Sequence, residues 1–247
     1  MSAEKPPLPR LLLIADGFAS GRDGRDAGAL WMLVEQVQRL CGVRFIMLRD
    51  HQADDQTFTA AADVFSNHIQ SPIPMQRSAW RYLPTGTPEQ YRKARFQYGR
   101  EREPWCRLVV NGRPEAARTA LAGLHVGARG PSVASVAGQF PLVGYSAHGP
   151  EEAAQAARDG ADYVLFSPVF PTPSKPDHPG VGLDSLAEAV QAAYPAPVFA
   201  LGGITPGHVK ACLEAGAHGV AVLSGILDAS DPVAAACDYQ AALKNHA

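Results

Sequence analysis

The sequence predicts an α/β fold, a TIM (β/α)8 barrel, on three observations. Short, continuous apolar runs recur along the chain, and such runs indicate strands that are buried on both faces of a parallel sheet. Helical segments fill the gaps between them, so that eight strand–helix units can be counted. The length of 247 residues is typical of one barrel of this kind. We therefore expect a single TIM-barrel domain over residues 1–247.

The eight strands follow a short proline-rich lead-in at residues 1–9. We expect them at residues 11–15, 43–48, 108–110, 124–126, 142–146, 163–170, 198–204 and 219–225. Helices are expected around residues 30–40 and 55–67 and from Pro150 onward. A dinucleotide-binding sheet would need a GxGxxG loop after the first strand, but residues 16–24 have a different glycine spacing. The barrel is therefore the favoured architecture.

One segment does not fit this alternation. Residues 71–105 form an insertion rich in arginine and proline. One interpretation is a surface loop with a solvated helix near residues 88–98. The other is a cover or a subunit contact, because Trp80, Tyr82 and Trp105 are costly to expose. The sequence leaves both interpretations open.

The composition excludes several classes of partner. The net charge of −2 argues against nucleic acid or an acidic membrane surface, and no apolar run approaches the length of a membrane span. The four cysteines are widely spaced without a CxxC motif, so we expect no zinc site, reduced thiols and a cytoplasmic location. A small molecule is the expected partner, and the sequence is compatible with a homo-oligomer.

The last third of the chain carries residues suited to binding phosphate. Gly202 and Gly203 follow the seventh strand, and Ser224 and Gly225 end the eighth, which is the usual phosphate site of a TIM barrel. Glycine leaves backbone N–H groups open to an anion, and a helix beginning at Pro206 would add its dipole. A tight turn without a ligand is the alternative for the two glycines.

Further cationic and hydroxyl groups follow other strands. Thr172, Ser174 and Lys175 supply two hydroxyls and one cation in the loop after the sixth strand, although such residues are often merely solvated. Arg49 is a stronger indication, since an arginine at the end of a buried strand needs an anionic partner. His51 follows it closely. We expect these five residues to bind the substrate.

His148 is the candidate for proton transfer. It follows the fifth strand, and an imidazole can both take and return a proton near neutral pH. A histidine hydrogen-bonded within its loop is the alternative. Asn111 and Ser146 are further candidate substrate-binding residues at strand ends, whereas His125 is weaker because it can simply pack there.

Carboxylates are missing where a magnesium-pyrophosphate site would need them. The third strand is followed by residues 111–113 (Asn-Gly-Arg), and the fourth by residues 125–130, without an acid. Asp50 and Asp184 lie near the expected mouth but not on adjacent loops. We therefore expect no bound metal and no cofactor.

These residues resemble the thiamine phosphate synthase/TenI family. Its motifs are matched closely and in order by residues 144–148, 160–175, 200–206 and 219–225, within a specific match over about residues 142–235. The match is thinner but traceable upstream at residues 47–51, 109–113 and 124–130.

The resemblance implies a TIM barrel that binds a thiazole phosphate. Synthase members join the thiazole to a pyrimidine pyrophosphate with magnesium held by two aspartates, and those positions are Gly112 and Gly130 here. A lysine of the family pattern is replaced by His51. TenI members isomerise the thiazole without a metal, and the histidine of their S-x-H motif, His148 here, is implied to be the proton shuttle.

Three hypotheses follow. The first is a metal-independent thiazole tautomerase that converts a carboxythiazoline phosphate to the aromatic carboxythiazole phosphate, with Arg49 receiving the ring carboxylate. The second is a divergent thiamine phosphate synthase in which acids such as Asp50 replace the missing ligands. The third is a thiazole-phosphate-binding regulator without turnover.

Overall fold

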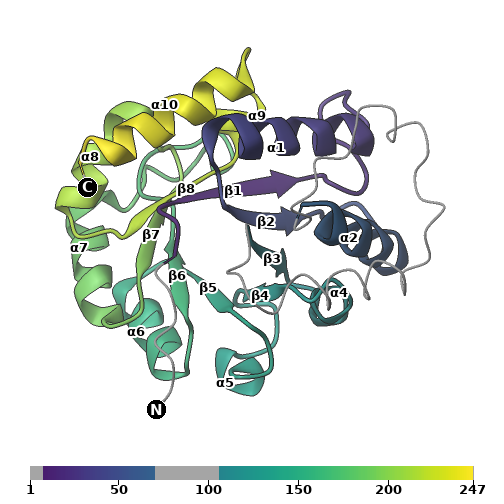
Figure 1. The fold of residues 1–247 in the computed structure, drawn as a ribbon. Coiled ribbons are helices and arrows are strands. Elements are labelled where there is room, and N and C mark those ends of the chain that lie inside the picture. Colours follow the sequence, from purple (N-terminus) through teal and green to yellow (C-terminus); the bar gives the residue numbers. More distant parts are fainter. Residues whose placement is uncertain (1–7, 70–105, 247) are drawn as a thin grey trace.

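The computed structural model describes residues 8–69 and 106–246, and its centre is a closed barrel of eight parallel strands in chain order (Figure 1). The strands are β1 (Leu11–Asp16), β2 (Phe45–Arg49), β3 (Arg107–Asn111), β4 (Gly123–Val126), β5 (Val143–Ala147), β6 (Tyr163–Phe166), β7 (Val198–Leu201) and β8 (Gly219–Val222). The barrel closes where β8 pairs with β1, with Leu12 opposite Ala221. The predicted TIM barrel is confirmed.

Successive strand side chains point alternately into two apolar layers. On β1, Leu12 and Ile14 belong to the cluster that fills the barrel, whereas Leu11 and Leu13 belong to the larger cluster beneath the helices. All four side chains are buried. Burial on both faces explains why the strands read as continuous apolar runs.

The helices surround the barrel (Figure 1). They are α1 (Ala27–Cys41), α2 (Asp55–Ile69), α4 (Pro114–Thr119), α5 (Val133–Val136), α6 (Pro150–Arg158), α7 (Gly182–Ala193), α8 (Val209–Glu214), α9 (Ser224–Leu227) and α10 (Pro232–Lys244), with a short 3-10 helix, η2 (Pro206–His208). Aspartates cap α1 and α10: Asp26 accepts from the N–H of Ala29, and Asp231 from that of Ala234. Each cap satisfies a backbone N–H that lacks a partner within its helix.

Three strands end earlier than their apolar runs predicted. β6 ends at Phe166, β7 at Leu201 and β8 at Val222. After β6 the chain reaches Pro168, which has no N–H for the strand ladder. After β7, Gly202 turns the chain with a φ of 97°. The remaining residues of these runs form loops at the mouth of the barrel.

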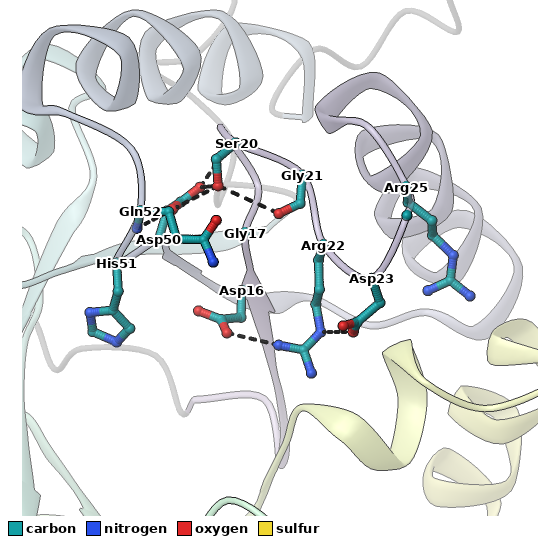
Figure 2. Close-up of a pocket in the computed structure, with 11 residues that line it drawn as sticks. Asp16, Gly17, Ser20, Gly21, Arg22, Asp23, Arg25, Asp50, His51 and Gln52 are labelled. Atoms are coloured by element: carbon teal, nitrogen blue, oxygen red, sulfur yellow. Dashed lines mark hydrogen bonds and ion pairs between the residues drawn. The ribbon is translucent and has the colours of Figure 1, made fainter.

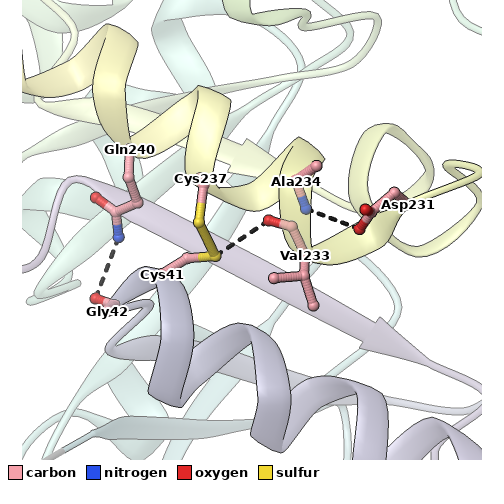
Figure 3. Close-up of a disulfide and its surroundings, with 7 residues drawn as sticks. All are labelled: Cys41, Gly42, Asp231, Val233, Ala234, Cys237 and Gln240. Carbon is pink, nitrogen blue, oxygen red and sulfur yellow. Dashed lines mark hydrogen bonds between the residues drawn. A yellow bond between two sulfur atoms is a disulfide. The ribbon is translucent and has the colours of Figure 1, made fainter.

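Cys41, the last residue of α1, forms a disulfide with Cys237 in α10 (Figure 3). The expectation of reduced thiols is therefore wrong for this pair, whereas Cys106 and Cys212 are free and buried. The two bonded cysteines are 196 residues apart in sequence, but their Cα atoms are 4.9 Å apart. Closure of the barrel places α1 beside α10, which cysteine spacing alone does not reveal (Figure 1).

Some sequence predictions concern other parts of the chain. The insertion at residues 71–105 and most of the lead-in lie outside the described residues, so the two interpretations of the insertion and the single-domain assignment stay predictions. Within residues 8–69 and 106–246, no helix combines the length and apolar character that a membrane span requires.

Candidate active site

His148 lies at the mouth of the barrel, directly after β5. Its side chain is exposed, and its Nδ1 is 2.6 Å from the carbonyl oxygen of Ser167. Because a carbonyl oxygen only accepts, Nδ1 carries the proton, and the lone pair of the neutral ring is on Nε2. The backbone N–H of His148 donates to Glu152 Oε2 at 2.9 Å. The Nδ1 contact orients the ring, and Nε2 has no hydrogen-bond partner among the described residues.

Arg49, at the end of β2, finds its anionic partner within the protein. Its Nε donates to Asp16 Oδ1 at 2.8 Å, across the β1–β2 pair. The other oxygen of Asp16 accepts from Arg22 Nη1 at 2.9 Å, and Arg22 Nη2 is 3.0 Å from Asp228 Oδ2. Sequence reasoning missed Asp16 and Arg22. Asp16 could have been singled out from the sequence, because it is a polar residue at the end of an apolar strand.

Asp50 is buried and ties together the loops that follow β1 and β2 (Figure 2). Its carboxylate accepts from the hydroxyl of Ser20 and from four backbone N–H groups, those of Ala19, Ser20, Gln52 and Ala53. Burial alone raises the pKa of Asp50, but the N–H donors outweigh it, so the pKa lies below its ordinary value. Both oxygens are occupied, and Asp50 is not available as a metal ligand.

A cavity of about 530 Å³ lies between these two loops (Figure 2). Its lining includes His51, which was predicted to bind substrate, together with Arg22 and Arg25, which were not predicted. Arg25 Nη1 donates to the carbonyl oxygen of Leu227 at 2.7 Å, so this loop also contacts α9. The cavity therefore brings three cationic or titratable side chains to the β1–β2 side of the mouth.

Gly202 and Gly203 are required by close packing. A Cβ at Gly202 would lie 2.7 Å from Pro168 Cα, and one at Gly203 would lie 2.3 Å from the carbonyl oxygen of Pro171. The tight-turn interpretation accounts for both glycines by itself. An anion at their N–H groups stays a prediction.

The helix expected to begin at Pro206 does begin there, as the three-residue η2 that runs directly into α8. Its dipole contribution to phosphate binding stays a prediction. His208, the last residue of η2, anchors the loop after β7. The His208 ring stacks on Phe170 with centroids 4.1 Å apart, and its Nδ1 is 3.0 Å from the carbonyl oxygen of Gly203. The loops after β6 and β7 are thereby joined.

The other predicted phosphate-binding residues lie at strand ends on the same side of the barrel. Ser174 and Lys175 are exposed and Thr172 is half-buried in the loop after β6, where the Lys175 N–H donates to the Thr172 carbonyl oxygen at 3.0 Å. Ser224 and Gly225 begin α9 after β8 and are exposed. Their role in binding stays a prediction.

The ends of β3 and β4 carry no carboxylate. Asn111, the last residue of β3, is half-buried, and the N–H of Gly112 donates to the carbonyl oxygen of His125 at 2.8 Å. The N–H of Gly130 donates to the carbonyl oxygen of Gly127 at 2.9 Å. No group of three or more His, Cys, Asp or Glu residues in the described part of the chain is placed to hold a metal ion. Among the described residues, the positions that follow β3 and β4 therefore offer no carboxylate to a magnesium ion.

His125 has a more specific environment than strand-end packing. It is buried inside the barrel, with Nδ1 2.9 Å from the Tyr163 hydroxyl and Nε2 2.8 Å from Ser146 Oγ. Burial, with a smaller contribution from the charge of Arg49, lowers the pKa of His125 to about 3. The ring is therefore neutral at physiological pH.

Residues 89–226 match the family model described as thiamine monophosphate synthase, which is more than half of the chain. The chain belongs to this family. A thiamine-phosphate synthase of Acidithiobacillus ferrooxidans is 40% identical over 163 residues, which cover 62% of this chain and 75% of that protein. The thiamine-phosphate synthase of Salinibacter ruber is 51% identical over 110 residues.

The Salinibacter alignment covers 44% of this chain and 48% of the relative, so the chain spans about half the length of that relative. A solved structure of thiamine phosphate pyrophosphorylase from Pyrococcus furiosus superposes with a TM-score of 0.68 at 20% identity, and 96% of each chain is covered. That similarity supports the barrel fold. The family predicted from the motifs is confirmed, and the names of these relatives favour the synthase over the tautomerase.

Proposed function

We propose that this member of the thiamine monophosphate synthase family is a metal-independent thiazole tautomerase acting on a carboxythiazoline phosphate. This proposal rests on which carboxylates are present at the barrel mouth and on what they already bind. Glycines occupy the two positions where the family pattern has aspartates, and Asp16, Asp50 and Asp228 are already engaged by arginines or backbone N–H groups. A reaction that needs only proton transfer suits this set of residues better than one that needs magnesium.

His148 would carry out the proton transfer. Its Nε2 removes the proton from the ring carbon that bears the carboxylate. The electrons of the broken C–H bond form a new double bond in the ring, and the existing conjugated double bonds shift by one position toward the exocyclic carbon. That carbon takes up a proton from the imidazolium, which regenerates the neutral histidine and leaves the ring aromatic. Ser167 stabilises both the neutral imidazole and the imidazolium, because its carbonyl oxygen accepts a hydrogen bond from the Nδ1–H of His148 in either form.

Substrate binding would use the predicted groups around the mouth. The phosphate would contact the strand ends after β7 and β8, with Lys175 as a neutralising cation. Arg49 is the proposed partner of the ring carboxylate, although its Nε already donates to Asp16. The carboxylate would therefore bind the two Nη groups.

The second candidate is the transferase, thiamine phosphate synthase, and the names of the relatives favour it. It would join a thiazole phosphate to a pyrimidine pyrophosphate. Asp50 was the acid expected to replace a missing magnesium ligand, and its hydrogen bonds argue against that role. A synthase built on this chain would need another way to neutralise the pyrophosphate.

One experiment distinguishes the candidates. The protein is incubated with carboxythiazoline phosphate, and separately with thiazole phosphate plus pyrimidine pyrophosphate, each in magnesium and in EDTA. We expect aromatisation at the same rate in both media, measured by ultraviolet absorbance, and no coupling. Coupling in magnesium that disappears in EDTA would overturn the proposal, and no turnover of either kind would favour a binding protein.

A further inference from the structure

Three polar groups from neighbouring strands form a buried hydrogen-bond network inside the barrel, Tyr163–His125–Ser146. The Tyr163 hydroxyl is 2.9 Å from His125 Nδ1, and Ser146 Oγ is 2.8 Å from His125 Nε2. Tyr163 and His125 are at most 1% exposed, whereas Ser146 is half-buried. The network therefore opens toward solvent at the serine.

The buried end fixes the direction of the hydrogen bonds. Burial, with a smaller contribution from Asp162, raises the pKa of Tyr163 well above its ordinary value, so its hydroxyl keeps its proton. Among the described residues, His125 Nδ1 is the acceptor that this proton can reach. The opposite direction would leave a buried O–H without an acceptor, at a cost of about 1–3 kcal/mol.

The direction of the Tyr163–His125 hydrogen bond determines the direction of the next one. A neutral His125 that accepts at Nδ1 carries its proton on Nε2, and this N–H donates to Ser146 Oγ. The serine proton is then directed away from the ring, and no acceptor for it lies in the described part of the protein. Burial keeps the ring neutral, so this direction does not depend on pH in the physiological range.

Packing holds the buried end in place. The Tyr163 ring makes edge contacts with Phe45 and Phe199, at centroid distances of 5.3 Å and 5.9 Å. Gly144 provides the space, because a Cβ there would lie 2.4 Å from the Tyr163 hydroxyl oxygen. A fixed ring makes the orientation of the hydroxyl a property of the fold.

We infer that Tyr163 and His125 are positioning residues that orient the Ser146 hydroxyl as a hydrogen-bond donor for an anionic oxygen of the bound substrate. A hydroxyl that already accepts a hydrogen bond is polarised and donates more strongly. The inference rests on the proposed function only in placing the substrate next to Ser146. The direction of the hydrogen bonds can be measured without substrate.

The first test is the tautomer of His125, read from nitrogen chemical shifts in protein labelled with ¹⁵N-histidine. The resonances of His125 are assigned as those whose chemical shifts change in both the Ser146→Ala and the Tyr163→Phe variants. We expect the Nε2–H tautomer between about pH 5.5 and 8.5, and a mixture of tautomers in Tyr163→Phe. A Nδ1–H tautomer in the parent protein, or titration of this ring near neutral pH, would overturn the inference.

The second test is a double-mutant cycle on turnover, in whichever reaction the protein catalyses. We expect Ser146→Ala to lower kcat/KM by roughly 10- to 100-fold and Tyr163→Phe by about tenfold, as for hydrogen bonds to charged groups. The double variant should be no worse than Ser146→Ala, because Tyr163 acts through the serine. If the double variant instead lowers kcat/KM by the product of the two single effects, the positioning role of Tyr163 is contradicted.

Ser66→Ala serves as the stability control, since it removes another buried hydroxyl, one that donates to the Ala120 carbonyl oxygen. If neither reaction proceeds, the proposed function fails while the tautomer measurement still decides the positioning role.

Discussion

His148 Nδ1 lies 2.6 Å from the carbonyl oxygen of Ser167, so the residue after β6 determines which nitrogen of the histidine after β5 is basic. The alternative considered from the sequence was a histidine hydrogen-bonded within its own loop, whereas the ring bonds to the loop after the next strand, β6. The hydrogen bond uses Nδ1 and leaves Nε2 for the substrate. Two adjacent strand ends cooperate in this arrangement, which is typical of active sites in TIM barrels.

Replacement of His148 by glutamine should abolish proton transfer while preserving binding. We expect kcat to fall by about 10²- to 10⁴-fold, which is the usual contribution of a general acid–base group. The affinity for a thiazole phosphate, measured by calorimetry, should change by less than about threefold, since the phosphate contacts are at other strand ends. His246→Gln is the matched control, because His246 is exposed near the end of α10. Equal loss of binding and turnover would indicate a binding role for His148 instead.

The carboxylate of Asp50 should stabilise the fold in a pH-dependent way. Asparagine would present an amide N–H to the backbone donors, so Asp50→Asn should cost about 1–3 kcal/mol at pH 7. The pKa of Asp50 is lowered in the folded state, so its contribution is present above the ordinary aspartate pKa of about 3.9. It is lost as the pH falls through the lower, folded-state value.

Urea unfolding of parent and variant at pH 7, 5 and 3.5 tests this prediction. The difference in free energy of unfolding should be constant between pH 7 and 5 and should shrink at pH 3.5. Asp238→Asn, at an exposed site on α10, controls for the loss of one charge. A difference that grows on acidification would contradict the role given to Asp50.

The sequence was sufficient for the barrel because each strand is buried on both faces. Continuous apolar runs such as residues 11–15 indicate this burial directly. The order of the strands around the barrel is their order in the sequence. Strand ends were less predictable. The run after Tyr163 stays apolar beyond Phe166, but Pro168 cannot continue the ladder, and these apolar residues pack in a loop instead.

The site was predictable where a residue stands alone and not where partners meet across the barrel. His148 and Ser146 could be proposed as site residues because they lie at or just past the end of an apolar strand, and their roles stay predictions. The pairing of Arg49 with Asp16 could not, because it depends on the register of β1 against β2. The role of His125 likewise depends on Tyr163, which comes 38 residues later and reads as an ordinary strand residue.

Gly144 should be intolerant of a side chain. A Cβ there would lie 2.1 Å from Tyr163 Cζ, so Gly144→Ala should destabilise the protein by about 1–3 kcal/mol or more through overpacking. Gly28→Ala in α1 is the control, since its Cβ would meet its nearest atom at 3.4 Å and alanine favours helix. The stability of both variants is measured by thermal unfolding. If the ring is the obstacle, Gly144→Ala should cost less in a Tyr163→Leu background.

The disulfide between Cys41 and Cys237 should contribute strongly to stability. It closes a loop of nearly the whole barrel, with a sequence separation of 196 residues, and thereby restricts the unfolded chain. Removing it with Cys41→Ser/Cys237→Ser, or by reduction, should lower the free energy of unfolding by roughly 2–5 kcal/mol. The matched control is Cys106→Ser/Cys212→Ser, whose loss of stability should not depend on reductant, since both are free thiols.

Thiol counting in denaturant checks the bond itself. Two thiols are expected in the protein as purified under air and four after reduction, because Cys106 and Cys212 are the free cysteines. Four thiols before reduction would show that the pair is not bonded in solution. In that case α1 and α10 would be held together by packing alone, and reductant should leave the unfolding transition unchanged.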